Sequence, residues 1–197
     1  MEKELYPLFG VITTVITPFH EDGSIDFVSL RREIDAACKA GVGGFLVPCL
    51  ASELPQLNPE ERIQLTECVV DEAKGRAKVI AGIAADNQEG RIRNLKTYLA
   101  LGVDGINALI PFTTREEYRS YIEEIDSYHP EFLCIQDADF NGPGMPVDFL
   151  AELFNDIPSF RDMKVETKNC GEKYGQLLRA TNGKLNISSG WGNDQMI

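Results

Sequence analysis

The fold and the chemistry of this chain depend on one short stretch, Phe160-Arg161-Asp162-Met163-Lys164-Val165-Glu166-Thr167. Lys164 lies in the middle of an apolar segment that has the character of a buried β-strand. Burial disfavours the charged form of an amine, and a free amine attacks ketones and aldehydes to form a Schiff base. Most lysines near strand ends instead extend their ammonium groups into water and take no part in chemistry. On the strand alone, the solvated interpretation of Lys164 is favoured.

Length and composition narrow the class of protein. The 197 residues suffice for a single domain with a sizeable core, and 31 acidic against 19 basic residues give a net charge of −12. This balance argues against binding nucleic acid or an anionic membrane surface, so we expect small-molecule or protein partners. Because no apolar run approaches the ~18 residues that span a membrane, and the N-terminus lacks signal-peptide features, a cytoplasmic location is expected. The five cysteines show no metal-ligand spacing, and neither a metal nor a cofactor is expected.

Strand and helix patterns alternate along the chain. Strands are predicted at 10–19, 44–49, 78–84, 105–110, 132–137, 161–166 and 185–189. Helices are predicted between them, at 26–40, 58–74, 87–101, 114–127, 146–154 and 171–180. Asp26 and Asn58 are expected to be N-caps, and Thr114 with Glu117 is expected to form a capping box. Such alternation predicts a parallel sheet with helices outside it, either an open doubly wound sheet or a closed (β/α)8 barrel.

The placement of polar residues favours the barrel. The first strand is followed by Thr17-Pro18-Phe19 rather than by a glycine-rich dinucleotide fingerprint, which weakens the open-sheet interpretation. Polar residues instead gather at the C-terminal ends of several strands: Glu53, Gln136, Asp137, Asp139, Glu166, Thr167, Ser188 and Ser189. In a barrel these ends converge on one mouth, which is the usual face of the active site.

An ordered set of motifs spans almost the whole chain: Gly10-Val11-Ile12-Thr13, Thr17-Pro18-Phe19, Asp22-Gly23-Ser24-Ile25-Asp26, Gly41-Val42-Gly43-Gly44, Leu57-Asn58-Pro59-Glu60-Glu61-Arg62, Val79-Ile80-Ala81-Gly82-Ile83 and Met163-Lys164. The set resembles the dihydrodipicolinate synthase and N-acetylneuraminate lyase family, Schiff-base aldolases built on a (β/α)8 TIM barrel. The resemblance implies a single barrel domain over 1–197, with Lys164 as the Schiff-base lysine. It also implies a 2-oxo acid or related carbonyl substrate and a homo-oligomer, either a dimer or a tetramer.

The loop after the second strand departs from the family pattern. The family carries Gly-Thr-Thr-Gly-Glu there to hold the substrate carboxylate, whereas this chain reads Cys49-Leu50-Ala51-Ser52-Glu53 and keeps only the glutamate. Backbone N–H groups can still hold an anion, and Ser52 is a possible substitute donor. The residues expected to bind substrate are Leu50, Ala51, Ser52, Glu53, Ser189 and Gly190.

The fifth strand also departs from the family pattern. Where the family places a proton-relaying tyrosine this chain has Gln136, which hydrogen-bonds but does not transfer protons at accessible pH. By strand alternation Glu166 points the same way as Lys164, so it is either an acid/base group or an ion partner of the lysine. Asp139 is a second acid/base candidate, or a residue chosen for turn chemistry alone. Lys168 and Lys173 are expected to be solvated, with Lys168 as the alternative nucleophile.

Seven strands are predicted, and 190–197 reads as the start of a further helix. A closed barrel needs an eighth strand, so we expect a barrel truncated after strand seven with an open sheet edge. The family's interface tyrosine after strand four is also missing, which argues against dihydrodipicolinate synthase activity itself. The leading hypothesis is a lyase of the aldolase type acting through Lys164. The alternative is a degenerate barrel that binds a small acid without turnover.

Overall fold

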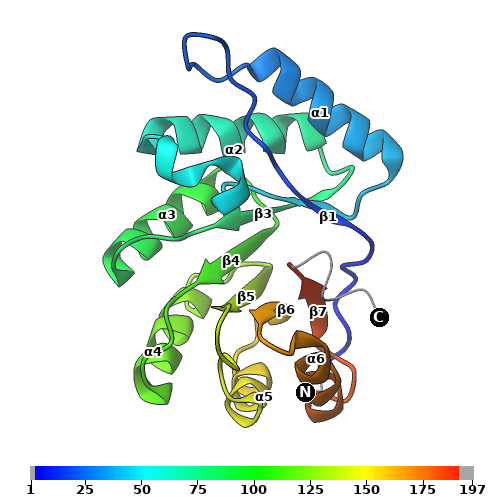
Figure 1. Cartoon of the computed structure of the whole chain (residues 1–197), viewed down its shortest axis with the longest axis vertical. Coiled ribbons are helices and arrows are strands. Elements are labelled where there is room, and N and C mark those ends of the chain that lie inside the picture. The colour runs from blue at the N-terminus through cyan, green and yellow to red at the C-terminus, as the bar shows by residue number, and fades with distance from the viewer. Residues whose placement is uncertain (1–2, 191–197) are drawn as a thin grey trace. The chain divides into compact units, whose positions relative to one another are not determined.

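The computed structural model describes residues 3–190, in which strands and helices alternate (Figure 1). The elements are β1 (Ile12–Thr14), α1 (Phe27–Ala40), β2 (Gly44–Leu46), η1 (Leu50–Ser52), η2 (Leu54–Gln56), α2 (Pro59–Ala73), β3 (Lys78–Gly82), α3 (Gln88–Ala100), β4 (Gly105–Leu109), α4 (Arg115–Asp126), β5 (Phe132–Asp139), α5 (Val147–Asp156), β6 (Phe160–Thr167), α6 (Cys170–Ala180) and β7 (Asn186–Ser189). The helix start predicted at 190–197 lies almost wholly outside the described residues.

The chain divides into two compact units. One unit is Leu8–Ile106, and the other is Asn107 onward together with the chain up to Pro7. In the first unit β2 pairs in parallel with both β1 and β3, and in the second β6 pairs in parallel with both β5 and β7. Within each unit the strands therefore follow their order in the sequence. Neither unit contains the reversal of strand order that marks the switch point of a doubly wound sheet.

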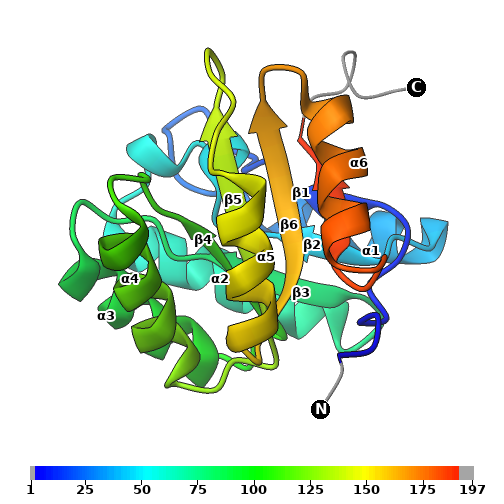
Figure 2. The same cartoon turned by 90° about the horizontal axis from the view of Figure 1, so that it is seen from below.

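Helices cover one side of the strands in each unit. Figure 2 shows α5 and α6 in front of β6 in the second unit, as expected when crossover helices connect parallel strands. Aromatic rings pack on the side facing these helices: Phe149 of α5 contacts Phe112 with ring centroids 5.7 Å apart, and Phe154 contacts Phe160 at 6.1 Å. Among residues 3–190, no helix has both the length and the apolar character needed to cross a membrane.

The predicted helix caps are largely confirmed. Asp26 accepts hydrogen bonds from the backbone N–H groups of Val28 and Ser29, both at 3.0 Å. Asn58 and Glu61 form a reciprocal capping box at the start of α2, with distances of 2.9 and 2.8 Å. These bonds satisfy N–H groups that a helix leaves without partners in its first turn.

The capping box predicted for α4 forms only in part. The hydroxyl of Thr114 accepts the Glu117 N–H at 3.2 Å, but the Glu117 carboxylate bonds to the hydroxyls of Thr113 and Tyr121 instead of returning to the cap backbone. The hydroxyls of Thr113 and Tyr121 thus occupy the carboxylate that would otherwise complete the capping box.

Strand lengths differ from the sequence-based predictions. β1 covers only Ile12–Thr14, because the later part of the predicted strand turns away: Thr17 donates to the backbone of Ser52, and Phe19 pairs with Ile25 across a tight turn. Strand β2 is likewise shorter than predicted. β5 instead runs through to Asp139, because its pairing with β6 continues to the last residue.

Substitution of Asn58 by alanine tests the α2 cap. Asn58→Ala removes the acceptor for the Glu61 N–H and should lower the free energy of unfolding by about 1 kcal/mol, measured by urea denaturation. Gln64→Ala, an exposed position within α2, is the matched control and should change stability by less than about 0.5 kcal/mol. An equal response of the two variants would contradict the capping role.

Candidate active site

Strand β6 turns three ionisable side chains to the same side. Asp162, Lys164 and Glu166 alternate with residues that face α5 and α6. The Nζ atom of Lys164 lies 3.3 Å from Oε1 of Glu166, and the two side chains are only 16% and 9% exposed. The sequence-based expectation that Glu166 points the same way as Lys164 is confirmed. The pair forms an ion pair largely sheltered from water.

Neighbouring strands hold the Glu166 carboxylate from two sides. Gln136 on β5, which is in register with Lys164, donates from Nε2 to Oε2 of Glu166 at 2.6 Å. Gly190 follows β7 and packs so closely that a Cβ atom there would lie 1.9 Å from Oε1 of Glu166. A side chain at this position would force the Glu166 carboxylate to move. Gln136, Glu166, Lys164 and Gly190, predicted from the sequence as site residues, therefore lie together.

A buried polar layer lies farther along β6 on the same side. The Ser188 hydroxyl donates to Oδ2 of Asp162 at 2.9 Å, and the thiol of Cys134 also hydrogen-bonds to Asp162. Asn107 in turn donates from Nδ2 to the Cys134 sulfur at 3.3 Å. Burial raises the pKa of the Asp162 carboxyl, opposed by its hydrogen bonds to Cys134 and Ser188, and burial raises the pKa of the Cys134 thiol well above its usual value.

The opposite side of β5 carries a second buried ion pair. Lys173 on α6 donates to Oδ2 of Asp137, and the two side chains are 7% and 4% exposed. The same ammonium donates to the carbonyls of Pro143 and Met145 at 2.6 and 2.7 Å. Burial raises the pKa of the Asp137 carboxyl, and the Lys173 charge opposes that rise. All three donor protons of this ammonium therefore have acceptors.

Lys173 corrects a sequence-based expectation. We expected it to be solvated, but it is buried, because α6 packs directly on the loop that follows β5. The signal that could have identified it is its place three residues into α6, one turn from the helix start and opposite an aspartate on a buried strand. Lys168, the alternative nucleophile, is exposed.

Asp139, the last residue of β5, bonds to the loop that follows the strand. By alternation it shares the side of Asp137, and its Oδ2 accepts the backbone N–H of Gly144 at 3.1 Å while its carbonyl accepts that of Gly142 at 3.3 Å. These contacts are the turn chemistry that the sequence offered as the alternative role. Asp139 thus shapes the loop after β5, and its role as an acid/base group stays a prediction.

Ser189 points away from Ser188, toward α6. It hydrogen-bonds the side chain of Tyr174, whose pKa burial raises to about 12. The substrate-binding role predicted for Ser189 therefore competes with a role in attaching α6 to β7.

The remaining predicted substrate-binding residues belong to the other unit. The Ser52 hydroxyl donates to the carbonyl of Val15 at 2.7 Å and accepts the Cys49 N–H at 3.2 Å, so its one proton is already used within the loop. Leu50 is 71% exposed, and Ala51 and Glu53 are also exposed. Glu53 joins η1 to η2 with a left-handed backbone, at φ 58°. Their role in binding substrate stays a prediction.

No group of three or more histidine, cysteine, aspartate and glutamate side chains is placed to hold a metal ion within residues 3–190. The ionisable groups near Lys164 are instead paired with one another or with amide, hydroxyl and thiol donors.

Removing the Lys173 charge should destabilise the fold. Lys173→Met leaves the Asp137 carboxylate buried without its partner, so the free energy of unfolding should fall by about 3 kcal/mol or more in urea denaturation. Asp137→Asn added to this variant should recover part of the loss. Lys168→Met, at an exposed lysine near the start of the same helix, is the control, and a loss as large as that of Lys173→Met would refute this explanation.

Asp162 should make stability depend on pH. Its pKa is higher in the folded than in the unfolded chain, so its contribution is fully present below the unfolded value and is lost as pH rises through the folded value. Asp162→Asn abolishes that loss. The stability of this variant relative to the natural chain should increase from about pH 4 to about pH 7 in urea unfolding series. Asp71→Asn, an exposed change on α2, should show no such trend, and a flat difference for Asp162→Asn would disprove the assignment.

Comparison with known sequences shows the family of the chain. The profile of the Dihydrodipicolinate synthetase family matches residues 7–197. The 4-hydroxy-tetrahydrodipicolinate synthase of Bacillus subtilis (strain 168) is 32% identical over 157 residues, 77% of this chain and 54% of that protein. The synthase of Oceanobacillus iheyensis is 30% identical over 194 residues, 92% of this chain and 63% of that protein. An uncharacterised DapA-like lyase of Rhizobium meliloti is 30% identical over 78% of this chain and 53% of its own length.

The chain thus spans between 53% and 63% of the length of these relatives.

Solved structures show the same fold. N-acetylneuraminate lyase from Fusobacterium nucleatum matches with a TM-score of 0.82 at 25% identity, over 93% of this chain and 64% of that one. Dihydrodipicolinate synthase from Aquifex aeolicus matches with a TM-score of 0.81 at 23% identity, over 92% and 62%. The described strands are the first seven of a (β/α)8 barrel, as predicted, and the chain belongs to the dihydrodipicolinate synthetase family.

Proposed function

We propose that this chain is the Schiff-base-forming part of a lyase of the aldolase type, in which Lys164 condenses with a 2-oxo acid or related carbonyl compound. The observation that carries the proposal is the sheltered pair of Lys164 and Glu166, 3.3 Å apart, near the C-terminal end of a strand in a family whose relatives are named as lyases and synthases. In barrels of this class, that end of the strands is where reactive groups gather.

The pair supplies both a nucleophile and a proton acceptor. Transfer of one proton from the Lys164 ammonium to Oε1 of Glu166 leaves a neutral amine beside a carboxylic acid. The amine nitrogen then bonds to the carbonyl carbon, and the carbonyl oxygen takes up protons and leaves as water, which produces the imine. Gln136 bonds the other carboxylate oxygen, so Oε1 stays directed at the amine throughout.

Glu166 is also the acid/base group best placed for the next step. An imine acidifies the C–H bonds on the adjacent carbon, and a base must remove one of these protons before a carbon–carbon bond forms or breaks. Gln136 occupies the position of the family's relay tyrosine but has no proton to exchange. The carboxylate of Asp139 is engaged by Gly144, which leaves Glu166 as our choice for the base.

A second candidate function is binding of a small acid without turnover. It is favoured by Gln136 in place of a tyrosine and by Leu50 and Ala51 in place of threonines. The two functions differ in whether bound pyruvate exchanges its methyl protons with solvent, since a protein that only binds leaves them in place. Synthesis of 4-hydroxy-tetrahydrodipicolinate, the product named for several relatives, is a third activity to assay.

Borohydride trapping tests the nucleophile. With pyruvate present, reduction should add the mass of the reduced imine to one peptide, the one containing Lys164. Lys164→Arg should abolish the adduct, because a guanidinium is not deprotonated in proteins and cannot form an imine. Lys168→Arg is the matched control and should keep it. An adduct that persists in Lys164→Arg and disappears in Lys168→Arg would move the reaction to Lys168.

Solvent exchange tests the base. In D2O, nuclear magnetic resonance should show the pyruvate methyl protons exchanging in the natural chain and exchanging at least about 100-fold more slowly in Glu166→Gln, since a positioned base contributes about 10²–10⁴-fold. Glu172→Gln, at an exposed position on α6, is the control. A trapped adduct without any exchange in the natural chain would support the binding function instead.

A further inference from the structure

We infer that the substrate of the Lys164 site carries an aryl or branched apolar group, which binds in a cavity beside the end of β5. This inference rests on the proposed function and narrows its substrate class. The carboxyl ends of β4 and β5 and the loop after β5 enclose a cavity of about 540 Å³. Its apolar wall comprises Leu109, Ile110, Phe112, Phe140 and Met145.

Gln136 links this cavity to the reacting amine. Its side chain lines the cavity, donates to Oε2 of Glu166 at 2.6 Å, and stands in register with Lys164 on the neighbouring strand. Paired strands lie about 5 Å apart, so a carbonyl at Lys164 is one strand away from the cavity. A substrate held as an imine at Lys164 therefore needs only a short substituent to reach the cavity.

The charges around the cavity disfavour a substrate whose substituent is anionic. The residues that line it include two aspartates, Asp137 and Asp139, and neither lysine nor arginine. The charge of Asp137 is balanced by Lys173, and Asp139 accepts the Gly144 N–H, so both carboxylates already have donors. A second carboxylate on the ligand would meet like charge and find no cation there.

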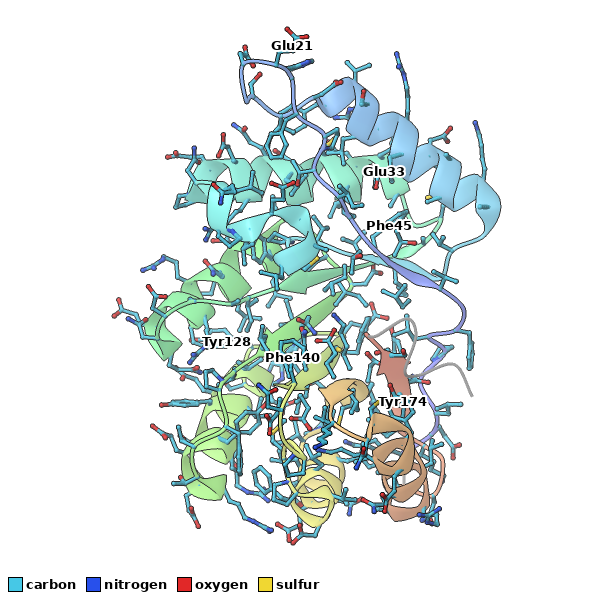
Figure 3. All side chains as sticks on the ribbon, in the orientation of Figure 1. Glu21, Glu33, Phe45, Tyr128, Phe140 and Tyr174 are labelled. Atoms are coloured by element: carbon cyan, nitrogen blue, oxygen red, sulfur yellow. The ribbon has the colours of Figure 1, made fainter. Side chains whose placement is uncertain are left out.

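Two aromatic rings remain partly uncovered at the cavity. Phe140 is 51% exposed and Phe112 is 38% exposed, although both belong to a unit with a well-buried core. Figure 3 labels Phe140, on the loop that continues from β5. Covering these faces with a ligand ring removes apolar area from water on both partners and allows stacked or edge-on ring contacts.

The loop that carries Phe140 is held in place before any ligand arrives. Lys173 bonds the carbonyls of Pro143 and Met145, and the Lys168 N–H bonds the carbonyl of Gly142 at 3.0 Å. A Cβ atom on Gly142 would lie 2.2 Å from a carboxylate oxygen of Asp139, so the loop backbone packs closely against that carboxylate. A wall fixed in this way loses little conformational entropy on binding, which favours affinity.

Separate titrations with three oxo acids test the inference. The natural chain is titrated with pyruvate, phenylpyruvate and 2-oxoglutarate, and the Lys164 adduct after borohydride reduction is quantified by mass spectrometry. Phenylpyruvate should reach half-maximal trapping at a concentration at least about tenfold lower than pyruvate, as burial of a ring predicts. 2-Oxoglutarate should need at least as much as pyruvate. Equal values for all three, or a preference for 2-oxoglutarate, would overturn the inference.

Variants assign the preference to the cavity. The preference is measured as the half-maximal concentration of pyruvate divided by that of phenylpyruvate. Phe140→Ala should lower this ratio by about fivefold or more, because it removes one ring of the cavity wall. Leu178→Ala, which truncates an exposed leucine on α6 away from the cavity, is the matched control and should leave that ratio unchanged. An unchanged ratio in Phe140→Ala would place the aryl group elsewhere and refute the assignment.

A binding measurement separates this inference from the proposed function. The non-reactive acid 3-phenylpropanoate, titrated by calorimetry, should bind the natural chain more tightly than Phe140→Ala. If no oxo acid gives a Lys164 adduct while this difference is found, the Schiff-base function fails and the apolar cavity stands. If adducts form but 3-phenylpropanoate binds both proteins equally, the function stands and the cavity inference fails.

Discussion

Strand β6 turns three ionisable side chains to one face of the sheet, and much of the surrounding structure compensates for their burial. Asp162, Lys164 and Glu166 are spaced two residues apart, and side chains at this spacing lie on the same face of a strand. Removing such groups from water costs several kcal/mol each unless partners replace the lost hydration. Each partner comes from a strand beside β6 or from β6 itself: Ser188 for Asp162, Glu166 for Lys164, and Gln136 for Glu166.

The same compensation shapes the other side of β5, where Asp137 meets Lys173. The ammonium is surrounded by one carboxylate and two backbone carbonyls, a complete set of acceptors for its three protons. Here the ion pair has a mechanical consequence, because two of those acceptors belong to the loop that forms a wall of the cavity. The buried pair therefore contributes to the binding surface through its geometry, whether or not it adds net stability.

Local patterns identified much of this in advance. Capping residues such as Asp26 and Asn58 marked helix starts to within a residue, because an N-cap depends on contacts within a single turn. Alternation placed Glu166 beside Lys164 for the same local reason. The short extent of β1 was not predictable, since it is set by Thr17 and Phe19 bonding to segments elsewhere in the chain. The Thr114 cap shows the same limit, because its partner Glu117 was taken by neighbouring hydroxyls.

By itself the sequence determined the alternation of strands and helices and the family, since these rest on periodicity and on ordered motifs, and it predicted Lys164 as the reactive lysine. The tertiary structure decided which polar residues share an environment. It grouped Gln136, Glu166 and Gly190 around Lys164, assigned Asp139 to a turn, and buried Lys173, which the sequence suggested was solvated. The physical reason is that burial and pairing depend on strand register and on which helix packs over which loop. The contacts of Gln136 with Glu166 and of Asp137 with Lys173, for example, join residues 30 and 36 positions apart.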